Sequence, residues 1–373
     1  MAATDLTPFR VDVPQAELDD LRARLLRTRW PAGQQLDGER GIPLGQVQRL
    51  AQHWATRFDW RAAEAELNRF DQVTTTIDGT RVHAVHARSA RADAPCLVLL
   101  HGWPGSVVEF QQVIAPLAES AHVVVPSLPG YGFSGPQPDG GWTSQRMADA
   151  VAELLDRLGY DRYVLHGGDW GSRVARDLAV RHPDRVAGLH VTMTMGLEPE
   201  DVDDDEAGRR AKERAARYAT ELSGYNKTQA TKPLSLVPAM TDSPAGLLAW
   251  IAERFRDWTD PDSDVFGPRT LDQVLANVAV YWFTGTAGSS SQLYWERVAH
   301  PGDEWDREVP TGVCVLPHDL RFPVRRAVEA ATNLVRWTEL PRGGHFPAIE
   351  VPDLLVEELR AFLDQVVPSP SDG

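Results

Sequence analysis

The sequence predicts an α/β protein with a mostly parallel central sheet that carries helices on both faces. From Cys96 onward, short β-rich runs alternate with helical stretches, the usual pattern of parallel strands joined by crossover helices. One such strand enters its helix through a glycine-flanked turn, Gly167-Gly168-Asp169-Trp170-Gly171. The alternation stops near Met195 and resumes at Val313. A helical segment is therefore expected to interrupt the sheet domain.

The residues before the sheet are expected to form an extension of helices and one hairpin. Leucines spaced three or four residues apart predict a helix over 14–26, and two further helices are expected at 47–57 and 61–69. The pair Asp78-Gly79 is a strong hairpin signal between two alternating runs that cover 73–87. This extension contains no cluster of catalytic residue types, so a structural role is expected for it.

The other elements follow from the same patterns. Strands are expected at 96–100, 122–125, 163–166, 186–191, 313–316 and 334–338. An acidic loop at 198–206 leads into aromatic-rich helices at 207–222, 244–258, 270–283 and 289–298, and a final amphipathic helix is expected at 352–366. The expected domains are the N-terminal extension (1–92), the first part of the sheet domain (93–197), a helical cap (198–300) and the second part of the sheet domain (301–373).

Composition excludes several classes of function. Apolar residues make up 42% and charged residues 24% of the chain, as in ordinary globular proteins. Acidic side chains outnumber basic ones by 53 to 38, and the net charge of −15 argues against nucleic acid or an anionic membrane as a partner. No apolar run approaches the roughly 18 residues of a membrane helix, and residues 1–10 lack a signal pattern. A soluble, cytoplasmic protein is expected, with Cys96 and Cys314 as buried strand thiols.

The turn around Asp169 is the most informative motif. Small residues two positions before and after the central residue are typical of a nucleophile elbow, because the turn is too tight for side chains there. Serine usually occupies the centre and performs acyl transfer. A carboxylate in its place predicts attack on a saturated carbon with a leaving oxygen or halide, through an ester on the enzyme. The elbow alone leaves epoxides and haloalkanes equally compatible.

Hydrolysis of such an ester needs a base that activates water, and histidine is the usual choice. His345 lies in a glycine-rich loop after the last expected strand, where the loops of this architecture build the site. Asp319, after the strand that begins at Val313, is expected to orient it, in the order nucleophile, acid, histidine. Glu329 and Glu339 are the alternatives, but a helix and a strand end favour a solvated role for them.

A second glycine-rich turn follows the first strand of the sheet, at His101-Gly102-Trp103-Pro104-Gly105. It is either a plain connection or half of an oxyanion hole. With Asp169 and His345 present, the functional interpretation is favoured, with the N–H groups of Trp103 and Trp170 as donors. A phenol could protonate an epoxide oxygen, but chemistry alone does not choose among the seven tyrosines.

Several segments of the chain resemble motifs of one known family and occur in the same order along the sequence. They are His101 to Ser106, Gly167 to Gly171, Ser223-Gly224-Tyr225 with Gln229 to Pro233, Asp242 to Leu247, Tyr281 to Thr286, and Gly343 to Phe346. With them the sequence resembles the epoxide hydrolases of the α/β-hydrolase superfamily, of the microsomal type with an N-terminal extension.

The resemblance implies the α/β-hydrolase fold and a role for each matching residue. Asp169 falls on the nucleophile, His345 on the base and Asp319 on the acid, while Tyr225 and Tyr294 fall on the pair that activates the epoxide oxygen. Some relatives have Glu where this chain has Asp319. The implied reaction converts an epoxide and water to a vicinal diol, and it needs no metal or organic cofactor.

The expected substrate is a small apolar or aromatic epoxide, because the cap is rich in aromatic residues. Trp103, Trp170, Trp282 and Phe346 are the candidate contacts. Two alternatives are disfavoured. A haloalkane dehalogenase shares the Asp nucleophile, but the cap segments around Tyr225 and Tyr294 decide against it, and a non-catalytic binding protein on the same fold would have no reason to keep the whole catalytic set. The sequence does not choose the epoxide, a detoxifying or biosynthetic role, the stereochemical outcome, or between a monomer and a homodimer.

Overall fold

A single nine-stranded sheet organises the computed structural model, which describes residues 6–32, 40–135, 137–197, 205–300 and 304–367. The strand order is β1-β2-β3-β5-β4-β6-β7-β8-β9. The first four strands in this order pair antiparallel, and the pairs from β5 through β4 to β9 are parallel. The strands are β1 (Thr7–Phe9), β2 (Asp71–Ile77), β3 (Thr80–Ala87), β4 (Cys96–Leu100), β5 (His122–Pro126), β6 (Tyr163–Gly167), β7 (Val186–Val191), β8 (Pro310–Val315) and β9 (Asn333–Glu339).

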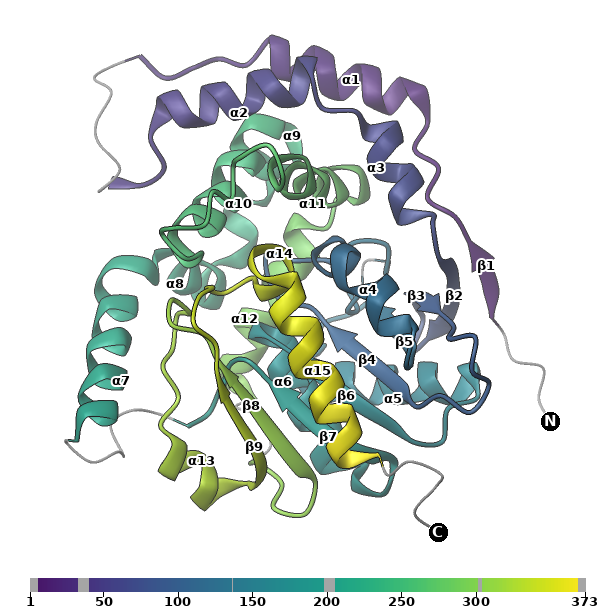
Figure 1. Ribbon diagram of the computed structural model, residues 1–373. Helices are drawn as coiled ribbons and strands as arrows, with labels where there is room; N and C mark the ends of the chain where they lie inside the picture. The colour runs from purple at the N-terminus through teal and green to yellow at the C-terminus, as the bar shows by residue number, and fades with distance from the viewer. Residues whose placement is uncertain (1–5, 33–39, 136, 198–204, 301–303, 368–373) are drawn as a thin grey trace.

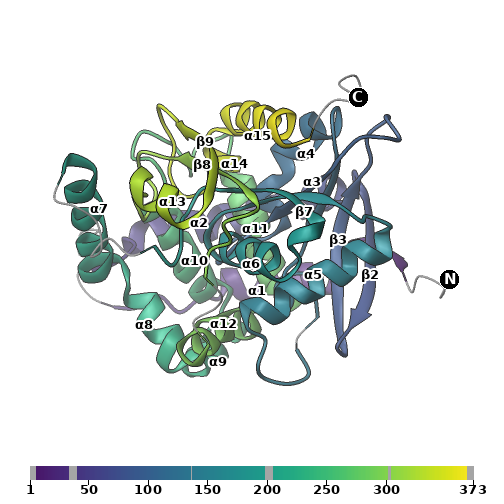
Figure 2. The same cartoon turned by 90° about the horizontal axis from the view of Figure 1, so that it is seen from below.

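Helices cover both faces of this sheet. Helices α4 (Gln111–Ala118) and α15 (Pro352–Val366) lie on one face, while α5 (Ser144–Leu158) and α6 (Asp169–Arg181) lie on the other (Figures 1 and 2). Strands β4 to β7 are buried along their whole length, because they have helices above and below. The predicted class, with a mostly parallel sheet and helices on both faces, is confirmed.

The cap is a group of helices between β7 and β8, above the carboxyl ends of the parallel strands (Figure 1). It consists of α7 (Glu206–Arg217), which continues as a π-helical turn over Tyr218–Leu222, and then α8 (Gly224–Thr231), α9 (Val237–Asp242), α10 (Pro244–Trp258), α11 (Leu271–Thr284) and α12 (Ala287–Ala299). The bounds of α10 and α15 are those that the sequence predicts. Most of the acidic loop expected at 198–206 lies outside the described residues.

The N-terminal extension runs over the top of the cap. Its helices α1 (Gln15–Leu26), α2 (Leu44–Thr56) and α3 (Trp60–Leu67) pass above α10 and α11 before the chain enters the sheet (Figure 1). The hairpin β2–β3 turns at Asp78, as predicted. Strand β1 is not anticipated from the sequence, since three residues are too few to show an alternating pattern. Two short helices, α13 (Arg325–Ala331) and α14 (Pro347–Glu350), flank β9.

Candidate active site

The nucleophile elbow joins β6 to α6, with Asp169 at its tip. Asp169 has a φ of 47°, in the left-handed region that non-glycine residues rarely adopt. The turn brings the backbone so close to β4 that a Cβ at Gly171 would lie 1.9 Å from the carbonyl oxygen of Leu100. A Cβ at Gly102 would lie 2.2 Å from Oδ1 of Asp169. The glycines therefore allow the strained turn and let a neighbouring loop approach the carboxylate.

The two oxygens of Asp169 have different surroundings. The backbone N–H of Trp103 donates to Oδ1 over 2.8 Å, while Nε2 of His345 lies 3.4 Å from Oδ2. The N–H of Trp170 belongs to the first turn of α6, where backbone N–H groups have no partner within the helix. Oδ1 is thus the oxygen held by a fixed backbone donor, and Oδ2 is the oxygen beside the imidazole.

His345 bridges two carboxylates. Its Nδ1 lies 2.7 Å from Oδ1 of Asp319, which is 1% exposed, and its backbone N–H donates to the carbonyl oxygen of Trp258 in the cap. Arg214 of α7 donates to the carbonyl oxygens of Pro317 and Asp319, and so fixes the loop that carries the acid. The structure therefore brings the predicted nucleophile, base and acid into one chain of contacts.

The charges of this chain control the protonation of His345. Burial disfavours the imidazolium, but Asp319 and then Asp169 outweigh burial and raise the pKa of His345 to about 10. Near neutral pH the ring is therefore protonated. Alkylation would convert Asp169 to a neutral ester and remove one of the two charges that hold this proton.

The alternative acids lie elsewhere. Glu329 is half-exposed on α13 and pairs with Arg325, and Glu339 is exposed at the end of β9, where it accepts from the indole of Trp337. Neither side chain is at the imidazole, in agreement with the preference for Asp319.

Tyr225 of α8 and Tyr294 of α12 face each other beside the elbow. Their ring centroids are 5.8 Å apart, and both side chains are buried. Trp103 stacks on Tyr225 with its ring 5.1 Å away, and Trp170 meets Tyr294 edge-on at 4.9 Å. Burial raises the pKa of both phenols well above the usual 10, so both remain protonated and can donate.

Three cap residues around Tyr225 are not anticipated from the sequence. The Asn226 amide donates to the hydroxyl of Tyr218 over 3.0 Å, and the hydroxyl oxygens of Tyr218 and Tyr225 are 3.1 Å apart. If the Tyr218 hydroxyl donates this hydrogen bond, the hydroxyl hydrogen of Tyr225 stays available for a substrate. The buried guanidinium of Arg254 lies 5.0 Å from the centre of the Tyr225 ring, where its charge favours proton release. The sequence around these three residues has an ordinary helical pattern of polar and apolar residues, so it does not predict any of these contacts.

Glu109 is a further residue that sequence reasoning missed. It lines a cavity of about 10 Å³ with Asp169, His345, Phe346 and the backbone around Gly102, which is close to the room that one water needs. Burial raises the pKa of Glu109 to about 8. The signal in the sequence is weak, since Glu109 stands seven residues beyond Gly102 in a 3-10 turn.

Three of the four predicted substrate contacts surround this site. Trp103 and Trp170 contact the tyrosine pair, and Phe346 packs on His345 and lines the small cavity. The predicted substrate contact at Trp282 is corrected, because its half-buried ring lies under the guanidinium of Arg24 in the N-terminal extension. One residue turns an α-helix by about 100°, so Trp282 points toward the extension while its neighbour Tyr281 donates to the carbonyl oxygen of Gly105.

Among the described residues, no group of three or more His, Cys, Asp and Glu side chains is arranged to hold a metal ion. No described helix combines the length and apolar character needed to cross a membrane. Cys96 and Cys314 are buried free thiols in β4 and β8, which confirms that prediction.

The fold and the elbow define an α/β hydrolase with a carboxylate where serine is usual. The family model for the α/β hydrolase fold matches residues 95–352, and the model described as the epoxide hydrolase N terminus matches residues 6–110.

Relatives cover nearly the whole chain. Epoxide hydrolase 1 of Sus scrofa is 30% identical over 96% of this chain and 88% of its own, and a protein of Stigmatella aurantiaca (strain DW4/3-1), named provisionally as an epoxide hydrolase, is 42% identical over 97% and 85%. The structure of Aspergillus niger epoxide hydrolase matches with a TM-score of 0.88 and 33% identity over 96% of both chains. That of juvenile hormone epoxide hydrolase from the silkworm Bombyx mori gives 0.89 and 29% over 97% and 94%. The chain belongs to the epoxide hydrolase family, whose members convert epoxides to diols through an ester on an aspartate.

Proposed function

We propose that Asp169 forms the covalent ester of this reaction. The observation that carries the proposal is the conformation of Asp169, which has a left-handed backbone at the tip of the elbow. Its Oδ1 accepts from the Trp103 N–H and its Oδ2 lies beside His345, next to two buried tyrosines. Because Oδ1 is held, Oδ2 attacks an epoxide carbon and the carbon–oxygen bond of the ring breaks. Tyr225 or Tyr294 gives its proton to the leaving oxygen.

The ester is then hydrolysed at the same place. Oδ1 is now the carbonyl oxygen of the ester, and the N–H groups of Trp103 and Trp170 stabilise the charge that develops on it. Loss of the Asp169 charge lowers the pKa of His345, which gives up its proton to the tyrosinate or to solvent and becomes a base. His345 then takes a proton from water as that water attacks the ester carbon, while Asp319 stabilises the imidazolium.

The attacking water fits the small cavity beside His345. Glu109 and His345 offer two polar partners there, and the cavity has room for about one water. Collapse of the tetrahedral intermediate expels the diol oxygen, which takes up a proton, and restores the Asp169 carboxylate. We place the carbon skeleton of the epoxide against Trp103, Trp170 and Phe346, so that an apolar or aromatic substituent beside the ring is favoured.

The test measures two products in parallel. The protein is incubated with styrene oxide and, separately, with 1-bromobutane, and the diol and bromide are quantified. Diol without bromide, lost in Asp169→Ala, is the expected result. Bromide release at a comparable rate would establish the dehalogenase instead, and no turnover of any epoxide would establish a binding protein. The cytoplasmic location and the absence of a nucleic-acid partner stay predictions from the sequence.

A further inference from the structure

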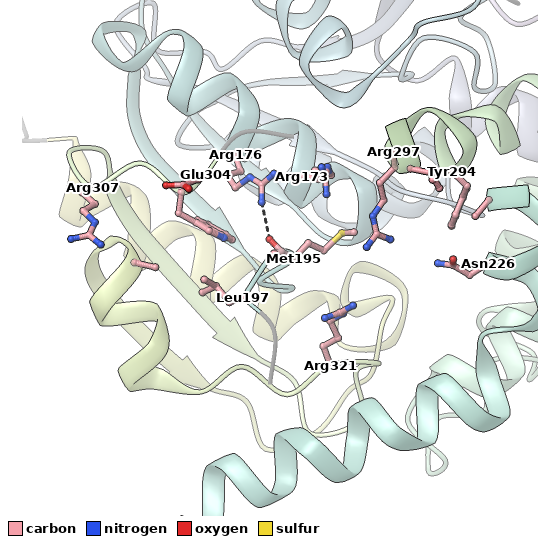
Figure 3. Close-up of a pocket in the computed structure, with 15 residues that line it drawn as sticks. Arg173, Arg176, Met195, Leu197, Asn226, Tyr294, Arg297, Glu304, Arg307 and Arg321 are labelled. Atoms are coloured by element: carbon pink, nitrogen blue, oxygen red, sulfur yellow. Dashed lines mark hydrogen bonds between the residues drawn. The ribbon is translucent and has the colours of Figure 1, made fainter. Parts of the chain in front are cut away.

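A large cavity lies between the cap and the sheet domain, on the outer side of Tyr294. Its volume of about 740 Å³ is within the usual range of ligand sites. Side chains of α8 and α12 form the cap side, and residues of α6, the segment after β7 and the segments before and after β8 form the other side (Figure 3). The cavity at Asp169 has only about 10 Å³, so a substrate that reaches Asp169 needs further space for the rest of its structure.

The large cavity is strongly cationic although the protein is acidic. Its described lining contains five arginines, Arg173, Arg176, Arg297, Arg307 and Arg321, against one carboxylate, Glu304. The whole chain carries a net charge of −15. A cluster of guanidinium groups in a concave site favours an anion, because the walls limit screening by water.

Two of these arginines have structural partners on the sheet domain. Arg176 donates to Oδ1 of Asp177 and to the carbonyl oxygen of Met195, and Arg173 donates to the hydroxyl of Ser144. Both are buried, and the ion pair with Asp177 largely offsets the charge of Arg176.

Arg297 and Arg321 point into the cavity from opposite sides. Arg297 comes from α12 and Arg321 from the loop after β8, and their guanidinium groups are directed toward the space between cap and sheet domain (Figure 3). Arg297 makes no hydrogen bond or ion pair with any described residue, and both side chains are partly exposed. A carboxylate can accept from two guanidinium groups placed in this way.

This cavity is in direct contact with one tyrosine of the epoxide-activating pair. Tyr294 forms part of its wall, and its ring packs on Trp170 next to the elbow. Asn226 also lines the cavity, and the same side chain donates to Tyr218, the neighbour of the Tyr225 hydroxyl. A molecule in the cavity therefore lies beside the groups that act on the epoxide oxygen.

Apolar side chains complete the wall. Met195, Leu197, Ala230 and Trp305 line the same space as the arginines. A purely inorganic anion would gain nothing from them, whereas an organic acid would bury its hydrocarbon part against them. The lining thus fits a molecule with an apolar body and an acidic group.

We propose that this cavity binds the anionic end of the substrate, so that the preferred substrates are epoxides that carry a carboxylate on their hydrocarbon part. The proposal rests on the proposed function, with Tyr294 acting on the epoxide oxygen, and it adds the class of substrate. Arg297 stands three residues after Tyr294, which places their Cβ atoms about 5–6 Å apart on one face of α12. The carboxylate accordingly lies several bonds from the epoxide ring, as it does across a para-substituted phenyl group.

The experiment compares two substrates of equal shape. These are 4-(oxiran-2-yl)benzoate and 4-(oxiran-2-yl)benzamide, which differ in charge but hardly in size. We expect kcat/KM for the benzoate to exceed that for the amide by about 10- to 100-fold, the worth of one charge-assisted hydrogen bond. In Arg297→Gln and in Arg321→Gln this ratio falls toward one. Circular dichroism and thermal melting of each variant establish that it is folded.

Arg307→Gln is the matched control. Arg307 is an exposed residue at the far rim of the cavity from Tyr294 (Figure 3), so this variant removes the same charge without changing the ratio. Equal turnover of the two substrates by the unaltered protein overturns the carboxylate site and leaves the proposed function standing. A ratio that survives both Arg297→Gln and Arg321→Gln also overturns it. Failure to hydrolyse either epoxide overturns the proposed function itself.

Discussion

Replacing Asp319 by Asn separates the two halves of the reaction. The substitution keeps the size of the side chain but removes the charge 2.7 Å from Nδ1 of His345. Attack by Asp169 on the epoxide does not use this charge directly, whereas hydrolysis of the ester depends on an imidazolium that Asp319 stabilises. We therefore expect the ester on Asp169 to form and then to persist.

The size of the effect follows from the burial of the pair. Asp319 is 1% exposed, and its second oxygen, Oδ2, has no hydrogen-bond partner among the described residues. For charges about 4 Å apart at an effective dielectric of about 20, the attraction is ~4 kcal/mol. That corresponds to roughly three units of His345 pKa, and we expect the hydrolysis step to slow by about 10³- to 10⁴-fold.

The assay is a rapid-quench mixing experiment with intact-mass spectrometry. In Asp319→Asn, a species heavier by the mass of one epoxide should accumulate to nearly one per protein, while diol formation stays slow. Glu339→Gln is the control, because it removes a carboxylate that is closer to His345 in sequence but is exposed and away from the imidazole. Diol formation at the normal rate in Asp319→Asn, or slow turnover with no adduct, would refute this assignment of roles.

Three further predictions follow from the same geometry. Tyr225→Phe and Tyr294→Phe should each slow ester formation about 10- to 100-fold, and the double variant about 10²- to 10⁴-fold, measured as the single-turnover rate of adduct formation. Gly171→Ala should lower the free energy of unfolding by about 3 kcal/mol, because its Cβ would overlap the β4 backbone, whereas Gly224→Ala, with no atom within 4 Å, should be nearly neutral in denaturant titrations. The pKa of His345 is raised to about 10 in the folded protein, so the stability it contributes is present below the unfolded value of about 6.5 and is lost as pH rises toward 10. The difference in stability between the protein and His345→Gln should shrink over that range, and a difference that grows would contradict the charge assignment.

The parts of the site that the sequence predicts depend on local rules. The elbow at Asp169 can be predicted because only glycines fit around so tight a turn. His345 and Asp319 can be predicted because both lie in loops after strands of the parallel sheet. The strands of the parallel sheet can also be predicted, because burial on both faces makes them continuous apolar runs.

The remaining parts depend on how separate elements pack. Trp282 shares its apolar character with residues of the site, and only the rotation of α11 against the extension decides that it meets Arg24. Glu109, Tyr218 and Arg254 carry no motif, because only folding brings their neighbours close, in the sheet domain for Glu109 and in the cap for the other two. The positions of these residues in the sequence do not predict such contacts.

The amino-acid composition does not predict the cationic cavity either. A net charge of −15 describes the whole chain, while the arginines of this cavity come from α6, α12, the start of the second half of the sheet domain and the loop after β8. Their convergence is a property of the fold, and the sequence gives no sign of it.

The central claim is that Asp169 forms an ester whose carbonyl carbon is attacked by water. A single turnover in H₂¹⁸O, with the protein in excess over the epoxide, tests it directly. Attack on the ester places one ¹⁸O in the carboxylate of Asp169, so the peptide that contains Asp169 should gain about 2 Da while the diol stays unlabelled. Label in the diol and none in Asp169 would show that water attacks the epoxide itself, and would contradict the account.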